Sequence, residues 1–331
     1  MILITGAAGY IGSHATLKFI EDNEVIIFDN LSTGHIETVN ALQKISDKVQ
    51  FEKGDLLNIK DIERVFEKYK IDAVIHFAAF SLVGESVENP VKYYKNNIRG
   101  SYNLFKTMVK YNVLKIVFSS TAAVYGNPIT DSIEENHPKN PINPYGLSKL
   151  TVEKILDNFD KKYNLKSIRL RYFNVAGADS KIRVGEWHNP ETHLIPNVIK
   201  AILNKNECFK VFGNDYKTKD GSCIRDYVNV EDLIRAHYLA YQYLKKENTS
   251  NVFNLGANNY KSVYEIVELT KKLTNSDINI EIAPRRAGDP DILCADSTKA
   301  GKYLNWTPQK TIEDSILTAY NWEKHRNLIY A

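Results

Sequence analysis

The chain has 331 residues, of which 43% are hydrophobic and 25% charged, and these proportions are typical of soluble globular proteins. The 43 lysines and arginines nearly balance the 40 aspartates and glutamates, giving a formal net charge of +3 without any long run of like charges, which argues against nucleic acid or a membrane surface as a partner. The three cysteines lie far apart and the first residues do not resemble a signal peptide, so we expect a reduced, cytoplasmic protein.

Short apolar segments alternate with helical patterns through the first half of the chain, which is typical of repeated β-α-β units. We therefore expect an α/β fold with a doubly wound parallel sheet, whose ligands bind at the carboxyl ends of the strands. The predicted strands are residues 2–5, 24–28, 49–53, 73–77, 115–119 and 167–171. The predicted helices are residues 13–22, 59–69, 91–111 and 145–163, and Asn143 and Pro144 are suited to cap the last of them.

The alternation changes after Asn174, where a passage rich in Gly, Asn and Pro runs from Gly177 to Pro196. Beyond it we expect helices near residues 194–203 and 230–244 and a strand at 209–212. The sequence thus predicts a first domain at residues 1–176 and a smaller α/β substrate-binding region at 177–331, with some chain crossing back to the first domain.

A glycine-rich loop joins the first predicted strand to the first helix, with the sequence Gly6-Ala7-Ala8-Gly9-Tyr10-Ile11-Gly12. Glycine allows a tight turn there and lets backbone N–H groups approach a pyrophosphate, which then lies at the positive end of the helix dipole. A G-x-x-G-x-x-G match at this place in the chain is rare by chance. The loop therefore predicts that the first domain is of the Rossmann type and binds a dinucleotide through Gly6, Gly9, Tyr10, Ile11 and Gly12.

The ends of the next strands indicate which dinucleotide binds. Asp29 ends the second strand, where a carboxylate accepts hydrogen bonds from an adenosine ribose and repels a 2'-phosphate, so NAD is favoured over NADP. Asp55 and Leu56 follow the third strand and suit contact with the adenine. The segment Phe77-Ala78-Ala79 follows the fourth strand and gives a small, close-packed backbone along which the cofactor can lie.

Tyr145 and Lys149 are four residues apart and are predicted to project from one face of a helix. An ammonium beside a phenol lowers the pKa of the phenol, so we expect a general base that works near neutral pH. Spacing alone does not decide this, because the chain contains five Tyr-x-x-x-Lys pairs. Tyr145 is distinguished by Ser119, Ser120 and Thr121 at the end of the fifth strand, where Thr121 can share the reacting hydroxyl of a substrate.

These motifs resemble those of the extended short-chain dehydrogenase/reductase family, which shares the glycine loop, the hydroxyl residue after the fifth strand and the Tyr-x-x-x-Lys pair. Within that family the chain is most similar to the UDP-glucose 4-epimerases, and the similarity runs over nearly the whole chain. The segments that carry it are 4–6, 29–31, 76–79, 93–97, 171–174, 212–216, 225–227 and 285–289.

The resemblance implies a tightly held NAD that oxidises C4 of a UDP-hexose and returns the hydride after the 4-keto sugar has turned over. Tyr145 would move the O4 proton, Lys149 would tune Tyr145 and hold the nicotinamide ribose, and Thr121 would guide the hydroxyl. Further cofactor contacts implied are Asn30, Asn96, Ser119, Tyr172 and Phe173. Substrate contacts implied are Asn174, His193, Leu194, Phe212, Arg225, Tyr227, Arg286, Asp289 and Leu293. It also implies a homodimer formed through the helices at 91–111 and 145–163.

Three positions depart from the common pattern of these epimerases. Ser81 stands where many members have a lysine near the nicotinamide ribose, and His193 stands where many have an asparagine near the nucleotide. Leu293 is smaller than the tyrosine that some members have at the edge of the sugar pocket. We therefore expect room for an N-acetylated sugar such as that of UDP-GlcNAc.

Related activities on this fold require other residues. A nucleotide-sugar 4,6-dehydratase typically has an Asp-Glu pair after the threonine, whereas Ala122 and Ala123 stand here and cannot transfer protons. A UDP-glucuronate 4-epimerase or a related decarboxylase stays open, and a non-catalytic NAD-sensing regulator is the alternative from another class. His188 and His193 are interpreted as loop residues, and no metal is expected.

Overall fold

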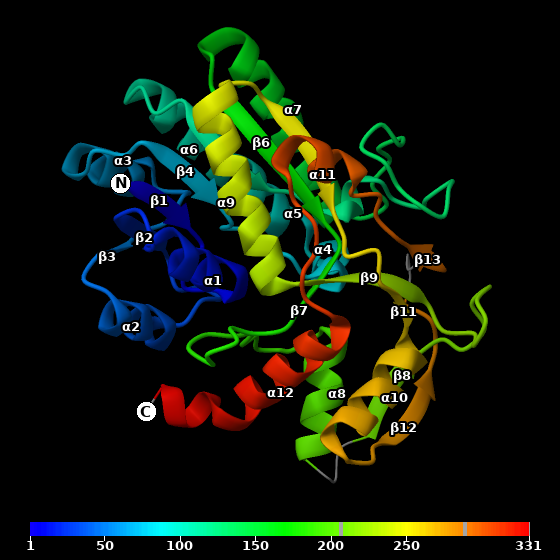
Figure 1. Cartoon of the computed structure of the whole chain (residues 1–331). Helices are drawn as coiled ribbons and strands as arrows, with labels where there is room; N and C mark the ends of the chain where they lie inside the picture. Colours follow the sequence, from blue (N-terminus) through cyan, green and yellow to red (C-terminus); the bar gives the residue numbers. More distant parts are fainter. Residues whose placement is uncertain (205–207, 287–289, 331) are drawn as a thin grey trace.

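The computed structural model describes residues 1–204, 208–286 and 290–330. Seven parallel strands form its central sheet, in the order β10-β6-β5-β4-β1-β2-β3 (Figure 1). The run from β3 to β6 is the strand order of doubly wound dinucleotide-binding domains, so the predicted fold class is confirmed. The strands are β1 (Ile2–Thr5), β2 (Val25–Asp29), β3 (Val49–Lys53), β4 (Ala73–His76), β5 (Lys115–Ser119), β6 (Lys166–Tyr172) and β10 (Asn251–Leu255).

The six predicted strands are present within one or two residues of their expected ends, and β10 was not predicted. The strands β1, β2 and β4 are buried along their whole length, because helices cover both faces of the sheet. Continuous apolar runs are the pattern of such strands. Since β1 lies between β2 and β4, the chain reverses its winding direction there, and the crevice at the carboxyl ends of β1 and β4 is the expected ligand site.

Two layers of helices sandwich the central sheet (Figure 1). On one face α1 (Tyr10–Phe19), α2 (Ile36–Ile45) and α9 (Val230–Glu247) share a hydrophobic core with the sheet. On the other face α3 (Ile59–Lys68), α6 (Gly100–Lys110) and α7 (Pro144–Tyr163) form a second core. The first helix begins at Tyr10 and not at Ser13 as predicted, because the extended Gly9 (φ −92°, ψ −179°) serves as its N-cap.

The long helix predicted for residues 91–111 is divided in the structure. It consists of α5 (Pro90–Tyr93), a π-helical turn (Tyr94–Arg99) and α6, and α4 (Val83–Glu88) precedes it. The side chain of Asn97, within the π-helical turn, donates to the carbonyl oxygen of Phe80 and to Ser148 Oγ, at 3.0 Å each. π-Helical turns are rare and often occur at functional sites, and this one lies against the helix that carries Tyr145.

A smaller region follows the central sheet. Here β9 (Ile224–Asn229) pairs with β7 (Asn174–Ala176), β11 (Tyr260–Ser262) and β13 (Ile292–Leu293), while β8 (Cys208–Phe212) pairs with β12 (Asn279–Ala283). Helices α8 (Leu194–Leu203), α10 (Val263–Thr274) and α12 (Ile312–Ile329) pack around two further apolar clusters. The short α11 (Thr298–Leu304) contacts β10 and α9 of the larger part.

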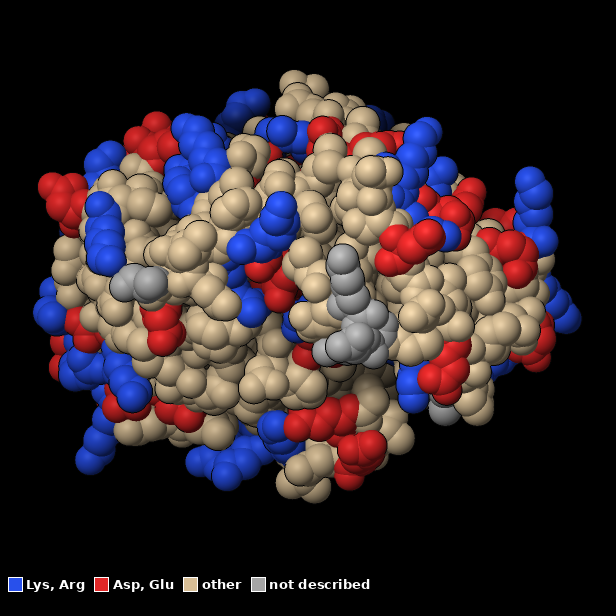
Figure 2. Space-filling view, turned by 90° about the horizontal axis from the view of Figure 1, so that it is seen from below, with Lys and Arg blue, Asp and Glu red and all other residues tan. Residues whose placement is uncertain are grey.

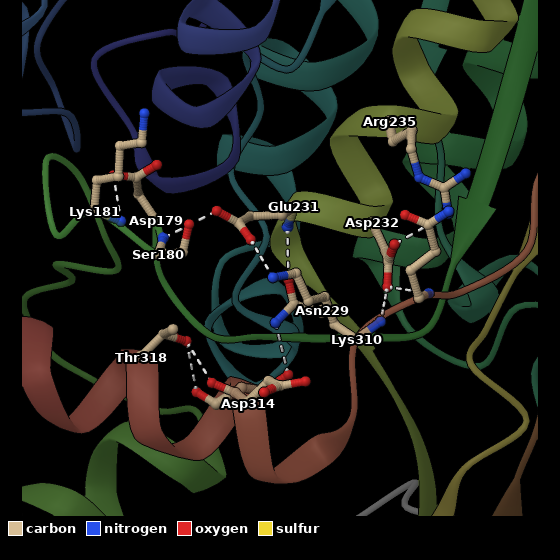
Figure 3. A network of polar contacts seen from close by, with 12 residues as sticks. Asp179, Ser180, Lys181, Asn229, Glu231, Asp232, Arg235, Lys310, Asp314 and Thr318 are labelled. Atoms are coloured by element: carbon tan, nitrogen blue, oxygen red, sulfur yellow. Dashed lines mark hydrogen bonds and ion pairs between the residues drawn. The ribbon is translucent and has the colours of Figure 1, made fainter.

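Polar contacts fasten α12 and the preceding segment to the start of α9 (Figure 3). The carboxylate of Asp232 accepts hydrogen bonds from the backbone N–H groups of Gln309 and Lys310, at 2.8 Å each. Asn229 caps α9 and donates to Ser315 Oγ at 2.9 Å. These bonds join the smaller region to a helix that lies on the central sheet.

Charges are mixed on the molecular surface. In Figure 2 basic and acidic side chains are interspersed over the face that is shown, without a field of one sign. None of the helices in the described part of the chain combines the length and the apolarity that crossing a bilayer requires.

Candidate active site

The glycine loop lies at the switch point, between the ends of β1 and β4. Gly6 has φ +76°, and a Cβ atom there would lie 2.6 Å from the backbone nitrogen of Ala78. A Cβ atom on Gly12 would lie 2.4 Å from the carbonyl oxygen of Gly6. The N-cap of α1, Gly9, has no side chain to satisfy the first N–H groups of the helix. The loop therefore presents a tight backbone cradle for an anionic group at a helix N-terminus, which fits a dinucleotide pyrophosphate.

Asp29 lies at the end of β2 beside this loop and is 8% exposed. Its carboxylate accepts hydrogen bonds from the backbone N–H groups of Ala8 (3.1 Å) and Leu31 (2.8 Å). Burial raises the pKa of Asp29, and these two bonds lower it. The aspartate thus shapes the glycine loop itself, in addition to facing the place where a ribose is expected.

The other residues predicted around the cofactor lie at the same edge of the sheet. Asn30 donates to Asp55 Oδ2 at 3.1 Å, and Leu56 is 9% exposed beneath α6. The backbone nitrogen of Ala78 donates to the carbonyl oxygen of Thr5 at 3.1 Å, and the ring of Phe77 packs on His237 with centroids 4.8 Å apart.

The structure brings Thr121, Tyr145 and Lys149 together at the end of β5. Asn143 Oδ1 accepts from the backbone nitrogen of Gly146 at 2.8 Å, which starts α7 so that Tyr145 faces the strand end. The hydroxyl of Thr121 is hydrogen-bonded to the phenol of Tyr145. The buried amine of Lys149 donates to the carbonyl oxygen of Ser119 at 2.8 Å. This group of a phenol, a hydroxyl and an amine can move a proton to and from an alcohol.

The electrostatics of the phenol differ from the expectation. Burial raises the pKa of Tyr145 to about 12, and only the hydrogen bond with Thr121 opposes it. Burial also lowers the pKa of Lys149 to about 7, against the charge of Glu153. Desolvation therefore dominates in the chain by itself, and the pKa of Tyr145 lies above its ordinary value of 10 although Lys149 is one helical turn away.

A buried ion pair that was not predicted from the sequence lies next to this site. Arg171 and Glu153 are each 3% exposed, and Nη2 of Arg171 lies 2.5 Å from Oε2 of Glu153. Ser120 donates to Glu153 Oε1 at 2.5 Å, and Arg171 Nη1 donates to Tyr125 Oη at 2.9 Å. The pair thus joins α7, the end of β5 and β6. Glu153 lies one helical turn after Lys149, which was the available signal for it.

Further predicted cofactor residues surround the same group. The hydroxyls of Tyr172 and Ser119 are 2.6 Å apart, and burial followed by the charge of Tyr145 raises the pKa of Tyr172. Asn96 donates to Asn97 within the π-helical turn at 3.0 Å. Phe173 belongs to a buried cluster with Ala122 and Leu150, which follow Thr121 and Lys149 in the chain, and Leu293 on β13 packs against this cluster.

Four of the predicted substrate residues lie on β7, β9 and β13. Asn174 is paired with Tyr227 in the β7–β9 register, and Arg225 with Leu293 in the β9–β13 register. Arg225 is 6% exposed and donates to the carbonyl oxygen of Pro290 at 2.8 Å.

Two aromatic residues of this group are also placed by the structure. The guanidinium of Arg286 lies 4.1 Å above the ring of Phe212. Burial raises the pKa of Tyr227, against the charge of Arg225. Asp289 lies outside the described residues.

His193 is the N-cap of α8 and Leu194 is its first residue. His188 and His193 lie in the loop before α8 as expected, but their rings are 5.2 Å apart and both face Glu186 and Glu191, which was not predicted. Burial lowers the pKa of His193, but the charges of Glu186 and Glu191 and the hydrogen bonds to them together outweigh it and raise the pKa to about 10. The signal for this cluster in the sequence is that each of the two acids lies two residues before a histidine.

Comparison with known proteins shows which family this chain belongs to. A family model described as GDP-mannose 4,6 dehydratase matches residues 3–318. A UDP-glucose 4-epimerase of Lactobacillus helveticus is 49% identical over 98% of this chain and 97% of its own length. One from Halalkalibacterium halodurans is 48% identical over 98% and 95%. The chain belongs to the UDP-glucose 4-epimerases of the extended short-chain dehydrogenase/reductase family.

Solved structures of this family have the same fold. The UDP-glucose 4-epimerase from Bifidobacterium longum in complex with NAD+ and UDP is 37% identical, covers 100% of this chain and 99% of its own, and has a TM-score of 0.94. The UDP-Glc/GlcNAc 4-epimerase from Campylobacter jejuni is 42% identical, covers 98% and 99%, and has a TM-score of 0.85. The dehydratase named by the family model needs acid/base groups where this chain has the methyl side chains of Ala122 and Ala123.

Proposed function

We propose that this protein is an NAD-dependent UDP-glucose 4-epimerase that interconverts UDP-galactose and UDP-glucose. The observation that carries the proposal is the meeting of Thr121, Tyr145 and Lys149 beside the glycine loop of a doubly wound sheet, in a chain up to 49% identical to named UDP-glucose 4-epimerases. When bound, NAD supplies an acceptor and donor for the hydride at C4 of the sugar.

The chain's own residues perform the proton transfer. Tyr145 removes the proton from O4 as C4 is oxidised and returns it when C4 is reduced. Thr121, hydrogen-bonded to the same phenol, orients the O4 hydroxyl. Lys149 is held by the carbonyl oxygen of Ser119 and carries the positive charge that favours the phenolate.

The smaller region holds the nucleotide while the sugar turns. A 4-keto sugar that presents both faces to one cofactor cannot itself be gripped, so binding energy has to come from the UDP part. Arg225 and Arg286 supply guanidinium groups for the diphosphate. Asn174 is paired with Tyr227 on the neighbouring strands β7 and β9, and Phe212 on β8 lies under the guanidinium of Arg286. We propose accordingly that residues 1–176 bind NAD and that residues 177–331 bind the UDP-sugar.

Proton NMR of UDP-galactose incubated with the purified protein and no added cofactor tests the activity. Appearance of the anomeric signal of UDP-glucose, with the same final ratio from either sugar, is expected. Absence of conversion even after addition of NAD would refute the proposal. In that case a tight cofactor without turnover of any nucleotide sugar would identify a regulator instead of an enzyme.

The substrate range is expected to include N-acetylated sugars. Leu293 packs against the cluster that contains Phe173, and it leaves more space there than a tyrosine. UDP-GlcNAc should therefore be converted to UDP-GalNAc, and the same NMR assay detects it. A protein that converts UDP-glucuronate faster than UDP-glucose would show that the uronate alternative is the correct one.

We further propose a homodimer, a cytoplasmic location and a role in galactose metabolism. Val83, Val87, Val91 and Leu147 are exposed apolar residues on α4, α5 and α7, which suits these helices to pack against a second copy. The three cysteines, Cys208, Cys223 and Cys294, lie far apart in the sequence, which suits a reducing compartment. Sedimentation analysis of the purified protein tests the oligomeric state.

A further inference from the structure

Four metal-binding side chains converge in the loop before α8. The segment 186–193 contains Glu186, His188, Glu191 and His193. Each of them offers one ligand atom, and these four atoms all lie within 4.8 Å of one another. The side chains of the two glutamates are 5% and 4% exposed, whereas those of His188 and His193 are 27% and 45% exposed. Two buried carboxylates and two imidazoles thus share one small volume at the surface.

The contacts have the arrangement of ligands around one centre. Nδ1 of His188 lies 3.1 Å from a carboxylate oxygen of Glu186 and 3.8 Å from one of Glu191. Nδ1 of His193 lies 2.6 and 3.2 Å from oxygens of the same two residues. Ligands held about 2.0–2.1 Å from a tetrahedral metal ion are about 3.4 Å apart, so small shifts would centre all four on one ion. An imidazole N–H, in contrast, points along one direction and cannot serve two carboxylates equally.

The charge of the cluster suits a dication. Two carboxylates this deeply buried require compensation, and one divalent ion supplies it completely. Imidazole and carboxylate ligands together suit zinc and its neighbours in the first transition row. Two protons on the imidazoles would give the same neutral sum, and this alternative is what the experiment has to exclude.

We propose that Glu186, His188, Glu191 and His193 bind one divalent transition-metal ion. The site lies beside the glycine loop, since the ring of His188 meets Tyr10 edge-on with centroids 6.3 Å apart, and His193 is the N-cap of α8. A bound ion therefore holds the loop 186–193 between the first helix of the sheet domain and the first helix of the smaller region. This role is separate from the proton and hydride chemistry at Tyr145.

Zinc binding by the full-length protein tests the proposal. The protein is treated with a chelator, dialysed, and titrated with zinc chloride in a calorimeter at pH 7.5. One zinc per chain with a Kd below about 10 μM is expected, with a loss of affinity of at least 100-fold in His188→Gln and in His193→Asn. The control His325→Gln removes an exposed histidine on α12 and should bind as the unaltered protein does.

Two further measurements keep the test decisive if a variant does not fold. X-ray absorption of the zinc-loaded unaltered protein should show two imidazole and two oxygen ligands at about 2.0–2.2 Å. Zinc at one hundred times its Kd should raise Tm by about 4 °C. Three results would each overturn the proposal: absence of binding up to 100-fold above the expected Kd, binding that survives both histidine substitutions, or a different ligand set. The two glutamates would then be neutralised by protonated histidines and not by a metal ion.

Discussion

Removal of the negative charge of Glu153 should destabilise the protein strongly, although this residue takes no part in proton transfer. In Glu153→Gln the guanidinium of Arg171 keeps its bonds to Tyr125 Oη and to the carbonyl oxygen of Glu135 but loses its only close anion among the described residues. Breaking a buried pair in this way costs about 3–5 kcal/mol. The entropy of unfolding is about 2.1 cal/mol/K per residue, or about 0.7 kcal/mol/K for 331 residues, so Tm should fall by about 4–7 °C.

Thermal unfolding followed by circular dichroism at pH 7 and fixed NAD concentration measures this loss. The matched control is Asp157→Asn, which removes the half-exposed partner of Arg169 on the same helix and should lower Tm by less than about 1.5 °C. Because the pKa of Glu153 is held below its usual value of 4.5, its contribution is complete above that pH and is lost as the pH falls further, so the two proteins should converge in acid. A change of Tm within 1 °C of the control would refute the reasoning.

Three other substitutions test the candidate active site and the contacts that join the smaller region to the central sheet. In Gly12→Ala the new methyl group meets a carbonyl oxygen of the same loop at 2.4 Å, so NAD affinity measured by fluorescence should fall at least about 10-fold; equal affinity would mean that the loop does not hold the cofactor closely. Lys149→Met should lower kcat at pH 7 by about 100-fold or more, with partial recovery at higher pH as Tyr145 ionises, and an unchanged pH profile would contradict the assigned role. Asp232→Asn weakens the acceptor of two backbone N–H groups before α12, so Tm should fall by about 2–4 °C, whereas an unchanged Tm would show that these bonds do not hold the regions together.

The central sheet was predictable because its strands have a simple physical signature. Segments such as Ile2–Thr5 and Val25–Asp29 are apolar up to their last residue, since helices bury both of their faces, and glycine or acidic residues mark their carboxyl ends. The same ends carry the glycine loop and Thr121, so the place of the site followed from the fold. The strand β10 escaped prediction because Asn251 and Asn254 interrupt its apolar pattern and its partner β6 lies far away in the sequence.

Features that depend on side chains meeting across the fold were not predictable. The π-helical turn at Tyr94–Arg99 contains no glycine or proline that would mark it, and its Asn97 makes contacts with Phe80 and Ser148 across the fold. Arg171 and Glu153 are separated by 18 residues, and only the packing of α7 on β6 shows that they form a buried pair. In each case the determining interaction is tertiary and leaves no local pattern.

The ionisation of Tyr145 shows how burial changes a conclusion drawn from spacing. Tyr145 and Lys149 are four residues apart in a helix and so lie on the same face. Desolvation nevertheless raises the pKa of Tyr145 to about 12 and lowers that of Lys149 to about 7. Each group alone is thus driven toward its neutral form. A phenolate at neutral pH therefore needs a second positive charge close to the phenol, and the crevice at the ends of β1 and β4 is where an oxidised nicotinamide ring would place one. The pKa of Tyr145 should consequently be lower in the presence of NAD+ than in the presence of NADH, which couples proton removal from O4 to the oxidation state of the cofactor.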